Sequence, residues 1–332
     1  MGRRAMSTES ALGVILAVLA PLVIAANVVV AVALLRLIQK TSSKGLYFVL
    51  NLAVADATVG VTVVGLVIDE FSQTLNWPQI FCVLRMAFVT SSSAASILSL
   101  VLVACDRHLA IRKPFHYLRL VTGARVGLRL LGVWLVAVLV GFLPALYPDF
   151  QKVSAHTKCF FFGVFQPAYM LTVFCVGFLP ALFVFAYLYC DMLKVASAHA
   201  QQILEVQQAG LAGGCLPPRP AGEVKAMRTV ALLIACFTLS WLPFFVVSIL
   251  QTACSSCYTH GVVENYLWLP GLFNSLLNPL LYSYRQKDVR RQLSQWVAGV
   301  KRRIFLRLGN GRRDPDRGAK ALPTVSCLQL QG

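Results

Sequence analysis

Oxygen-bearing side chains interrupt the apolar segments of this 332-residue chain, and side chains of these types could bind a cation. If the segments cross a bilayer, the charge of Asp56 costs about 2.5–3.5 kcal/mol at the centre and needs a partner. Carboxylate, amide and hydroxyl oxygens are hard ligands that suit Na⁺. The alternatives are a hydrated sodium or proton site and a hydrogen-bonded cluster that joins helices. The candidate residues are Asp56, Ser96, Asn274, Ser275 and Asn278, with Asn27 as a further hydrogen-bonding residue.

Pro243 and Pro279 lie inside apolar segments, where each should weaken a helix. Pro279 follows Asn278 in a segment that continues to Tyr282. Proline lacks a backbone N–H and clashes with the preceding turn, so we predict a hinge here. The carbonyl that it frees needs a donor from a neighbouring helix, because hydrocarbon offers none. Pro243 likewise predicts a kink just above Trp241, although a buried Trp beside a proline is also ordinary packing.

A charged pair, Asp106 and Arg107, stands at the inner end of the third apolar segment. Arg107 could extend to lipid phosphate. Alternatively, it could pair with Glu223, which begins the sixth segment on the same side. An ion pair at this rim is weak enough to break and strong enough to bias two states. The sequence therefore offers Arg107 and Glu223 as a conformational switch.

The composition excludes an ordinary soluble domain. Apolar residues make up 58% of the chain and charged residues only 13%. Windows of about twenty residues predict seven membrane-spanning helices, so the expected fold is an all-α seven-helix bundle. The predicted spans are 11–37, 46–69, 82–106, 126–147, 166–190, 228–251 and 263–284.

The basic residues predict the orientation of the bundle. Of the 30 Lys and Arg residues, 25 lie in or beside the connections after the first, third and fifth spans and in the final tail. The positive-inside rule places that side in the cytoplasm and the amino terminus outside. Membrane topology also explains the net charge of +17 better than nucleic-acid binding does. Arg3 and Arg4 depart from the rule, and a start at Met6 would remove them.

These observations divide the chain into four parts. Residues 1–10 form a short extracellular terminus, of which 1–5 would be untranslated under the shorter reading. Residues 11–284 form the bundle. Residues 285–299 show helical amphipathicity and should lie in the inner interface. Residues 300–332 form a basic and largely disordered cytoplasmic tail.

Two pairs of cysteines fall on the outer side. Cys82 and Cys159 face an oxidising compartment, so we predict a disulfide between them. Cys254 and Cys257 lie in the last outer loop near His260. A local disulfide or two free thiols is expected there, because a zinc site would lack a fourth ligand.

One or more motif residues in each span occur in an order that resembles the rhodopsin-like (class A) G-protein-coupled receptors. The resemblance implies a ligand cavity on the outer side. It also implies a sixth helix that swings outward to admit the alpha subunit of a heterotrimeric G protein. Arrestin and receptor kinases are further implied partners. The matching residues are Asn27, 51–56, Cys82, Asp106, Arg107, Trp134, Pro180, Trp241, Pro243 and 278–282.

Residues 13–20, 84–92, 189–194 and 266–268 resemble one lipid receptor of that family. That resemblance implies N-acylethanolamides such as oleoylethanolamide, and lysophosphatidylcholine, as ligands. It also implies coupling to the stimulatory G protein, a rise in cyclic AMP, and glucose-dependent insulin and incretin secretion. The alternative is another lipid or orphan ligand with different coupling. Glu70 and Asn265 differ from that receptor, which affects the expected selectivity.

Two further positions depart from the family. His108 replaces the usual Tyr after Asp106 and Arg107, without loss of the charged pair. Leu188 stands where the family has a Tyr that supports the active state. Tyr187 and Tyr189 flank it but should point elsewhere on the helix.

The expected ligand cavity is apolar. Val89 occupies the position where amine receptors carry an anchoring Asp, so a cationic amine should not bind tightly. Arg85 and Glu264 near the rim could hold a polar or phosphate-bearing head group, or could pair only with each other or with water. The apolar and aromatic candidates are Phe88, Val89, Phe160, Phe161, Phe162, Trp241, Phe244 and Trp268.

Enzymes and transporters are less consistent with the sequence. An intramembrane protease needs a Ser–His or paired-Asp centre, but no histidine lies deep in a span and Asp56 has no aspartate partner. A transporter would show an internal repeat and charges on several helices. We therefore expect a receptor with no catalytic residues and no cofactor other than an allosteric Na⁺.

Overall fold

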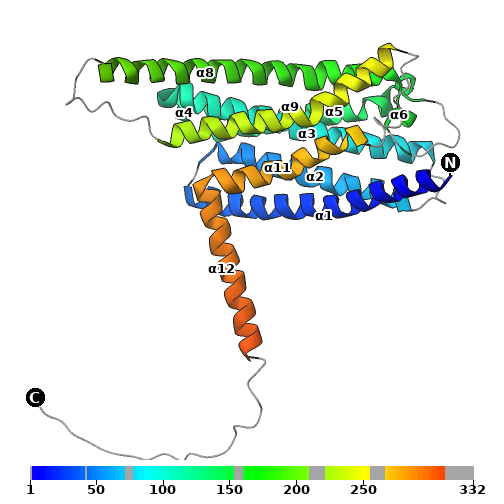
Figure 1. Ribbon diagram of the computed structural model, residues 1–332, viewed down its shortest axis with the longest axis horizontal. Coiled ribbons are helices and arrows are strands. Elements are labelled where there is room, and N and C mark those ends of the chain that lie inside the picture. The colour runs from blue at the N-terminus through cyan, green and yellow to red at the C-terminus, as the bar shows by residue number, and fades with distance from the viewer. Residues whose placement is uncertain are drawn as a thin grey trace, which may run out of the picture.

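In the computed structural model, the chain forms long helices that lie side by side, and a last helix leaves one end of the bundle (Figure 1). The structure describes residues 2–41, 43–71, 78–152, 159, 161–208, 221–254 and 266–310. The bundle contains α1 (Gly2–Thr41), α2 (Leu46–Phe71), α3 (Gln79–Arg112), α5 (Gly123–Leu146), α7 (Pro167–Val173), the π-turn η2 (Phe174–Phe178), α8 (Leu179–Gln208), α9 (Ala221–Ala253) and α11 (Leu269–Arg285). The shorter α4 (Pro114–Leu120), η1 (Pro148–Phe150) and α6 (Phe161–Val164) connect them, and α12 (Lys287–Asn310) comes last.

The predicted all-α fold is confirmed. Within the described ranges, six helical stretches are long and apolar enough to cross a membrane, from Ala11–Thr41 to Ala231–Leu250. The seventh predicted span corresponds to α11, of which 17 residues are helical. The predicted fifth span comprises α7, η2 and the start of α8. Helices α8 and α9 continue beyond the predicted inner boundaries, because hydropathy bounds only the apolar part of a helix.

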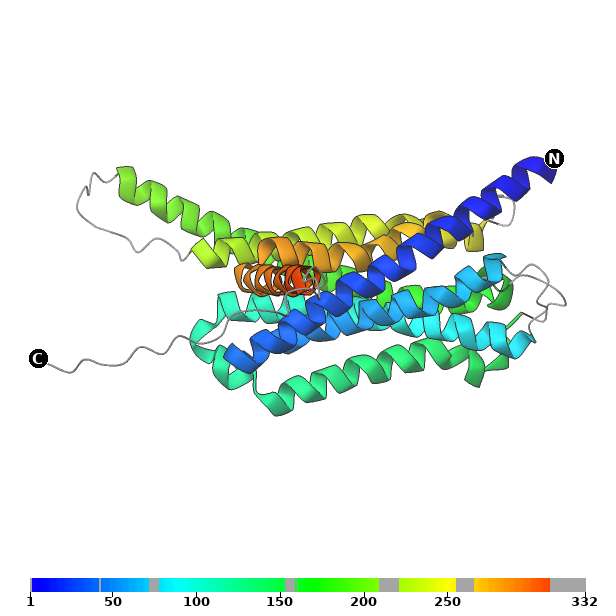
Figure 2. The ribbon, with the colours of Figure 1, turned by 90° about the horizontal axis from the view of Figure 1, so that it is seen from below.

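Both ends of the chain contain more helix than expected. Helix α1 begins at Gly2, within the predicted extracellular terminus. Helix α12 reaches Asn310, beyond the predicted end at residue 299. Gly299, at the predicted end, costs a helix only about 1 kcal/mol, and Leu, Lys and Arg residues continue through 300–308, so the helix does not stop there. In Figure 1 α12 points away from the bundle, and Figure 2 looks along it.

The wide turn η2 precedes Pro180 in the fifth span. The Leu179 N–H donates to the Phe174 carbonyl, five residues back, in place of the usual four. The ring of Pro180 clashes with the preceding turn and supplies no donor, so a local widening relieves the clash. Phe178 in this turn stacks on Phe245 of α9, with 4.4 Å between ring centroids. The π-turn therefore lies at the contact between the fifth and sixth spans.

Side chains from other helices satisfy two carbonyls that prolines leave free. Pro279 cannot donate to the Ser275 carbonyl, and Asn27 Nδ2 of α1 donates to it at 2.9 Å. Pro144 likewise frees the Val140 carbonyl, which accepts from the Tyr169 hydroxyl of α7 at 2.8 Å. The expectation that a neighbouring helix supplies the donor at Pro279 is confirmed.

Helix α3 lies at the centre of the bundle. Half of its most apolar stretch is buried, compared with 22% for the corresponding stretch of α5. It packs against α2, α5, α8 and α9. Most polar residues of the site described below therefore lie on α3 or on a helix next to it.

Candidate functional site

Asp56 is the hub of a buried polar cluster midway along the bundle. Its carboxylate is fully buried. Ser96 Oγ of α3 donates to Asp56 Oδ1 at 2.5 Å, and Asn278 Nδ2 of α11 donates to Asp56 Oδ2 at 2.9 Å. Because Asp56, Ser96 and Asn278 belong to α2, α3 and α11, these hydrogen bonds join the three helices. The predicted hydrogen-bonded cluster is therefore present.

The same cluster contains acceptors that no described residue satisfies. Asn27 Oδ1, Asn274 Oδ1 and Asn278 Oδ1 are buried without a hydrogen-bond partner in the described part of the chain. Ser275 is also buried beside them. Buried polar groups normally have a partner, and water or an ion supplies it where the protein does not. Amide oxygens beside a carboxylate are a donor set that fits Na⁺.

A second polar cluster lies next to the first. Asn51 Nδ2 donates to Ser99 Oγ at 2.7 Å, and Trp134 Nε1 donates to Asn51 Oδ1 at 2.9 Å. These bonds join α2, α3 and α5. The sequence pointed to Asn51 and Trp134 only through the family resemblance, and not to their contact.

The inner end of α3 holds Asp106 between two partners. The Arg107 Nε donates to Asp106 Oδ2 at 2.9 Å, and the Tyr117 hydroxyl of α4 donates to Oδ1 at 2.8 Å. Burial and then the Asp106 charge raise the pKa of the Tyr117 phenol to about 12, so the hydroxyl stays protonated and donates. A Cβ on Gly45 would lie 2.5 Å from both the Arg107 guanidinium and the Tyr117 hydroxyl. Arg107 thus pairs with its neighbour, and the side chain of Glu223 lies outside the described residues.

Asp191 of α8 links the inner ends of the third and fifth spans. Its Oδ2 accepts from Arg112 Nε and from His108 Nε2, each at 2.7 Å. His108 was expected only as a departure from the family, and the role of Asp191 was not predicted. An acidic residue just beyond the apolar part of a span, opposite a basic run, was the available signal. Leu188 is buried, whereas Tyr187 and Tyr189 are exposed, as the helical spacing predicted.

Trp241 of α9 lies against α11. A Cβ built on Gly271 would come within 2.7–2.8 Å of the Trp241 ring, so only glycine leaves room for it. The Trp241 ring also contacts Phe244 and Phe245, at 6.2 and 6.0 Å between centroids. A shift of the ring would therefore be felt in both helices.

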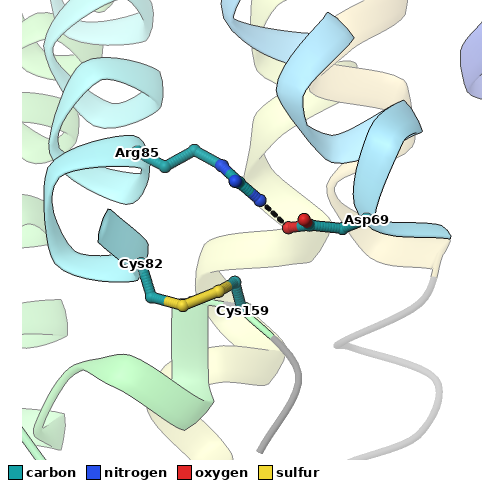
Figure 3. Close-up of a disulfide and its surroundings, with 4 residues drawn as sticks. All are labelled: Asp69, Cys82, Arg85 and Cys159. Atoms are coloured by element: carbon teal, nitrogen blue, oxygen red, sulfur yellow. Dashed lines mark hydrogen bonds and ion pairs between the residues drawn. A yellow bond between two sulfur atoms is a disulfide. The ribbon is translucent and has the colours of Figure 1, made fainter. Parts of the chain in front are cut away.

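The outer end of α3 carries the predicted disulfide and an unexpected ion pair (Figure 3). Cys82 is bonded to Cys159, with 5.1 Å between their Cα atoms, which confirms the predicted pairing. Arg85, one turn further along α3, reaches across to Asp69 of α2 and forms an ion pair. Both side chains are 16% exposed, and Asp69 Oδ1 has no hydrogen-bond partner in the described part of the protein. Glu264, which the sequence offered as an alternative partner for Arg85, lies outside that part.

Asp69 was not predicted, because the charged residues of neighbouring spans were not compared with each other. Asp69 ends the second span and Arg85 begins the third. Since these helices are antiparallel, the two ends must meet. Gly65 provides the room, because its missing side chain lets the Arg85 stem pass 3.4 Å from the Cβ position.

The predicted apolar ligand residues have different surroundings. Val89 and Trp268 are half-buried, and Phe244 is buried. The half-buried Phe161 stacks on Tyr169, with 5.8 Å between centroids. Phe88 is 54% exposed and lies edge-on to Phe142 of α5, which favours packing between α3 and α5 over a place in the cavity. Phe160, Asn265, Cys257 and the side chain of Phe162 lie outside the described residues, and Cys254 is disulfide-bonded.

Comparison with known proteins identifies similar chains. Residues 26–282 match the seven-transmembrane receptor model of the rhodopsin family. The chain is 48% identical to the human (Homo sapiens) glucose-dependent insulinotropic receptor, over 98% of this chain and all of that protein. It is 50% identical to the rat (Rattus norvegicus) receptor of the same name, over 89% of this chain and 64% of that protein. Rat 5-hydroxytryptamine receptor 4 is 31% identical over 80% of this chain and 70% of its own length.

Proposed function

Because the chain belongs to the rhodopsin family of seven-transmembrane receptors, whose partners are heterotrimeric G proteins, we propose that it is a receptor for lipid-derived ligands. Its ligands are N-acylethanolamides such as oleoylethanolamide, and lysophosphatidylcholine. It acts in the plasma membrane, with its amino terminus outside, and activates the stimulatory G protein to raise cyclic AMP. The full-length similarity to the glucose-dependent insulinotropic receptors carries this proposal and extends it to glucose-dependent insulin and incretin secretion.

The chemistry of α3 supports a lipid over an amine. Val89 offers no charge where an amine receptor places a carboxylate, despite the 31% identity to a serotonin receptor. Phe244, Trp241 and Trp268 belong to one packed apolar cluster, and an acyl chain gains about 0.8 kcal/mol per buried methylene. A lipid tail therefore suits this end of the bundle.

The Arg85–Asp69 pair supplies a head-group site of matching chemistry. Arg85 donates from a planar guanidinium, which suits an amide carbonyl or a phosphate. Asp69 Oδ1, buried and without a described hydrogen-bond partner, can accept from an amide N–H or hydroxyl. It also carries the charge that a choline ammonium needs. One pair thus serves both proposed ligand classes.

Activation then follows as a population shift. Ligand that favours a moved Trp241 ring favours movement of α9, because the ring lies between α9 and Gly271 of α11. At the inner end, Arg107 must leave Asp106 to face the G protein. Such a shift requires only that the ligand bind one state better than the other.

Cells that express the full chain test the function. Oleoylethanolamide and lysophosphatidylcholine should each raise cyclic AMP, while serotonin should not. Exchanging the charges, as Arg85→Asp with Asp69→Arg, should restore surface expression relative to either single variant. It should still leave the half-maximal lysophosphatidylcholine concentration at least about tenfold higher, because the phosphate would meet a carboxylate at position 85.

The charge exchange separates recognition from structure. A double variant with wild-type responses would show that the pair only holds α2 to α3. If neither lipid acts on wild-type chain at confirmed surface expression, the lipid proposal fails. A response to serotonin alone would then favour an amine receptor.

We further propose that Asp56, Ser96, Asn274, Ser275 and Asn278 hold Na⁺ in the described state. An ion there would tie α2, α3 and α11 together and so oppose ligand-driven movement. Replacing Na⁺ by N-methylglucamine should lower the half-maximal lipid concentration about fivefold or more in wild-type membranes, a typical coupling. Asp56→Asn, which keeps the shape but removes the charge, should abolish this dependence. Equal sodium dependence in both proteins would leave only the hydrogen-bonded cluster.

A further inference from the structure

Helices α1 and α12 meet at the inner end of the bundle and enclose a corner. Helix α12 runs across the direction of the bundle, as both views show (Figures 1 and 2). Val289 of α12 is fully buried at this joint. Lys40 Nζ of α1 lies 3.5 Å from Gln292 Oε1 of α12. The joint is thus a packed contact between two helices.

The corner contains a cavity of about 90 Å³. From α1, Val28, Val32 and Arg36 line it at a spacing of four residues, so they share one helix face. From α12, Gln292, Leu293 and Trp296 line it. Val28, Val32 and Trp296 are 39–47% exposed, which means that the cavity opens to the outside of the bundle. In a membrane this outside is lipid.

The side chains along α1 follow the order of groups in a phospholipid. Two valines precede Arg36, and Lys40 follows one turn later on the same face. Val28 and Arg36 are about 12 Å apart at 1.5 Å per residue, which fits the upper part of an acyl chain below a head group. Arg36 and Lys40 are both exposed, and of the described residues that line the cavity none is acidic. Trp296 suits the boundary between hydrocarbon and head groups.

We propose that this corner binds an anionic glycerophospholipid from the leaflet on the basic side of the membrane. One acyl chain occupies the cavity beside Val28, Val32 and Trp296. The anionic head group contacts Arg36 and Lys40. Lipid seated here covers the α1–α12 joint and holds α12 against the bundle. The site is separate from the outer head-group site, so it stands whichever ligand activates the receptor.

Native mass spectrometry of the purified full chain tests the site with two lipids of identical acyl chains, phosphatidylserine and phosphatidylcholine. Wild-type protein should retain phosphatidylserine at least about fivefold better than phosphatidylcholine. Arg36→Gln with Lys40→Gln should remove this preference. Trp296→Ser, at an exposed position that does not threaten folding, should weaken retention of both lipids while the preference persists.

Arg119→Gln with Arg125→Gln is the matched control, because both arginines are exposed on α4 and the start of α5, away from the corner. This control should keep the wild-type preference. Equal retention of the two lipids by wild-type protein would overturn the proposal. The proposal would also be overturned if the control lost the preference for phosphatidylserine as fully as the Arg36–Lys40 variant does. Displacement of bound phosphatidylserine by added cholesterol would overturn it as well.

Discussion

Removal of the Cys82–Cys159 disulfide, as Cys82→Ala with Cys159→Ala, should lower the temperature of half-denaturation by roughly 10 °C. The bond closes a loop between residues 77 apart in sequence. By the loop-entropy relation, closing a loop of this length destabilises the unfolded chain by about 4.5 kcal/mol. For a chain of this size, each kcal/mol corresponds to a few degrees. The measurement is the fraction of monodisperse detergent-solubilised receptor after heating.

The free cysteines provide the control. Cys105→Ala with Cys236→Ala removes two thiols from half-buried positions and closes no loop. It should shift the transition by only a few degrees. The disulfide variant should also lose lipid responses, because the bond holds the connection after α5 beside Arg85 (Figure 3). A transition within two degrees of the wild type would contradict the expected stabilisation.

Gly271→Leu should raise ligand-free cyclic AMP at least about threefold at equal surface expression. In the described state, even a methyl group at this position would collide with the Trp241 ring. Overpacking of this kind costs about 1–3 kcal/mol, and 1.4 kcal/mol is a factor of ten in an equilibrium constant. The substitution therefore penalises the state with the ring against α11. Gly271→Ala should act in the same direction with a smaller effect.

Gly132→Leu on α5 is the matched control for added bulk. Nothing lies within 4 Å of a Cβ built there. Its basal cyclic AMP should equal that of the wild type. If Gly271→Leu lowers basal signalling or leaves it unchanged, movement of Trp241 away from α11 is not part of activation.

Features that follow from composition or from one residue's chemistry could be predicted from the sequence. The apolar segments gave the helices because a bilayer fixes their length and character. The missing N–H of Pro279 required an outside donor, which Asn27 provides. Cys82 and Cys159 shared the oxidising side and form the disulfide.

Features that depend on how helices pair could not be predicted in this way. Hydropathy does not indicate which face of α2 contacts α3. The Arg85–Asp69 pair was therefore not predicted. The contact of Asp191 with His108 depends likewise on the rotation of α8 against α3. The inner ends of α8 and α9 were predicted too short, because charged residues end an apolar window without ending a helix.

The hydrogen bond from Asn27 to the Ser275 carbonyl gives α1 a role beyond forming the outer wall of the bundle. The carbonyl that Pro279 leaves without a backbone donor in α11 receives its hydrogen bond from a side chain of α1. Bending at Pro279 must therefore either carry α1 along or exchange that bond for one to water. The strength of this hydrogen bond from α1 therefore sets how freely α11 can bend at Pro279. Amino-acid changes far along the chain from Pro279, at the middle of α1, can consequently tune the hinge without touching it.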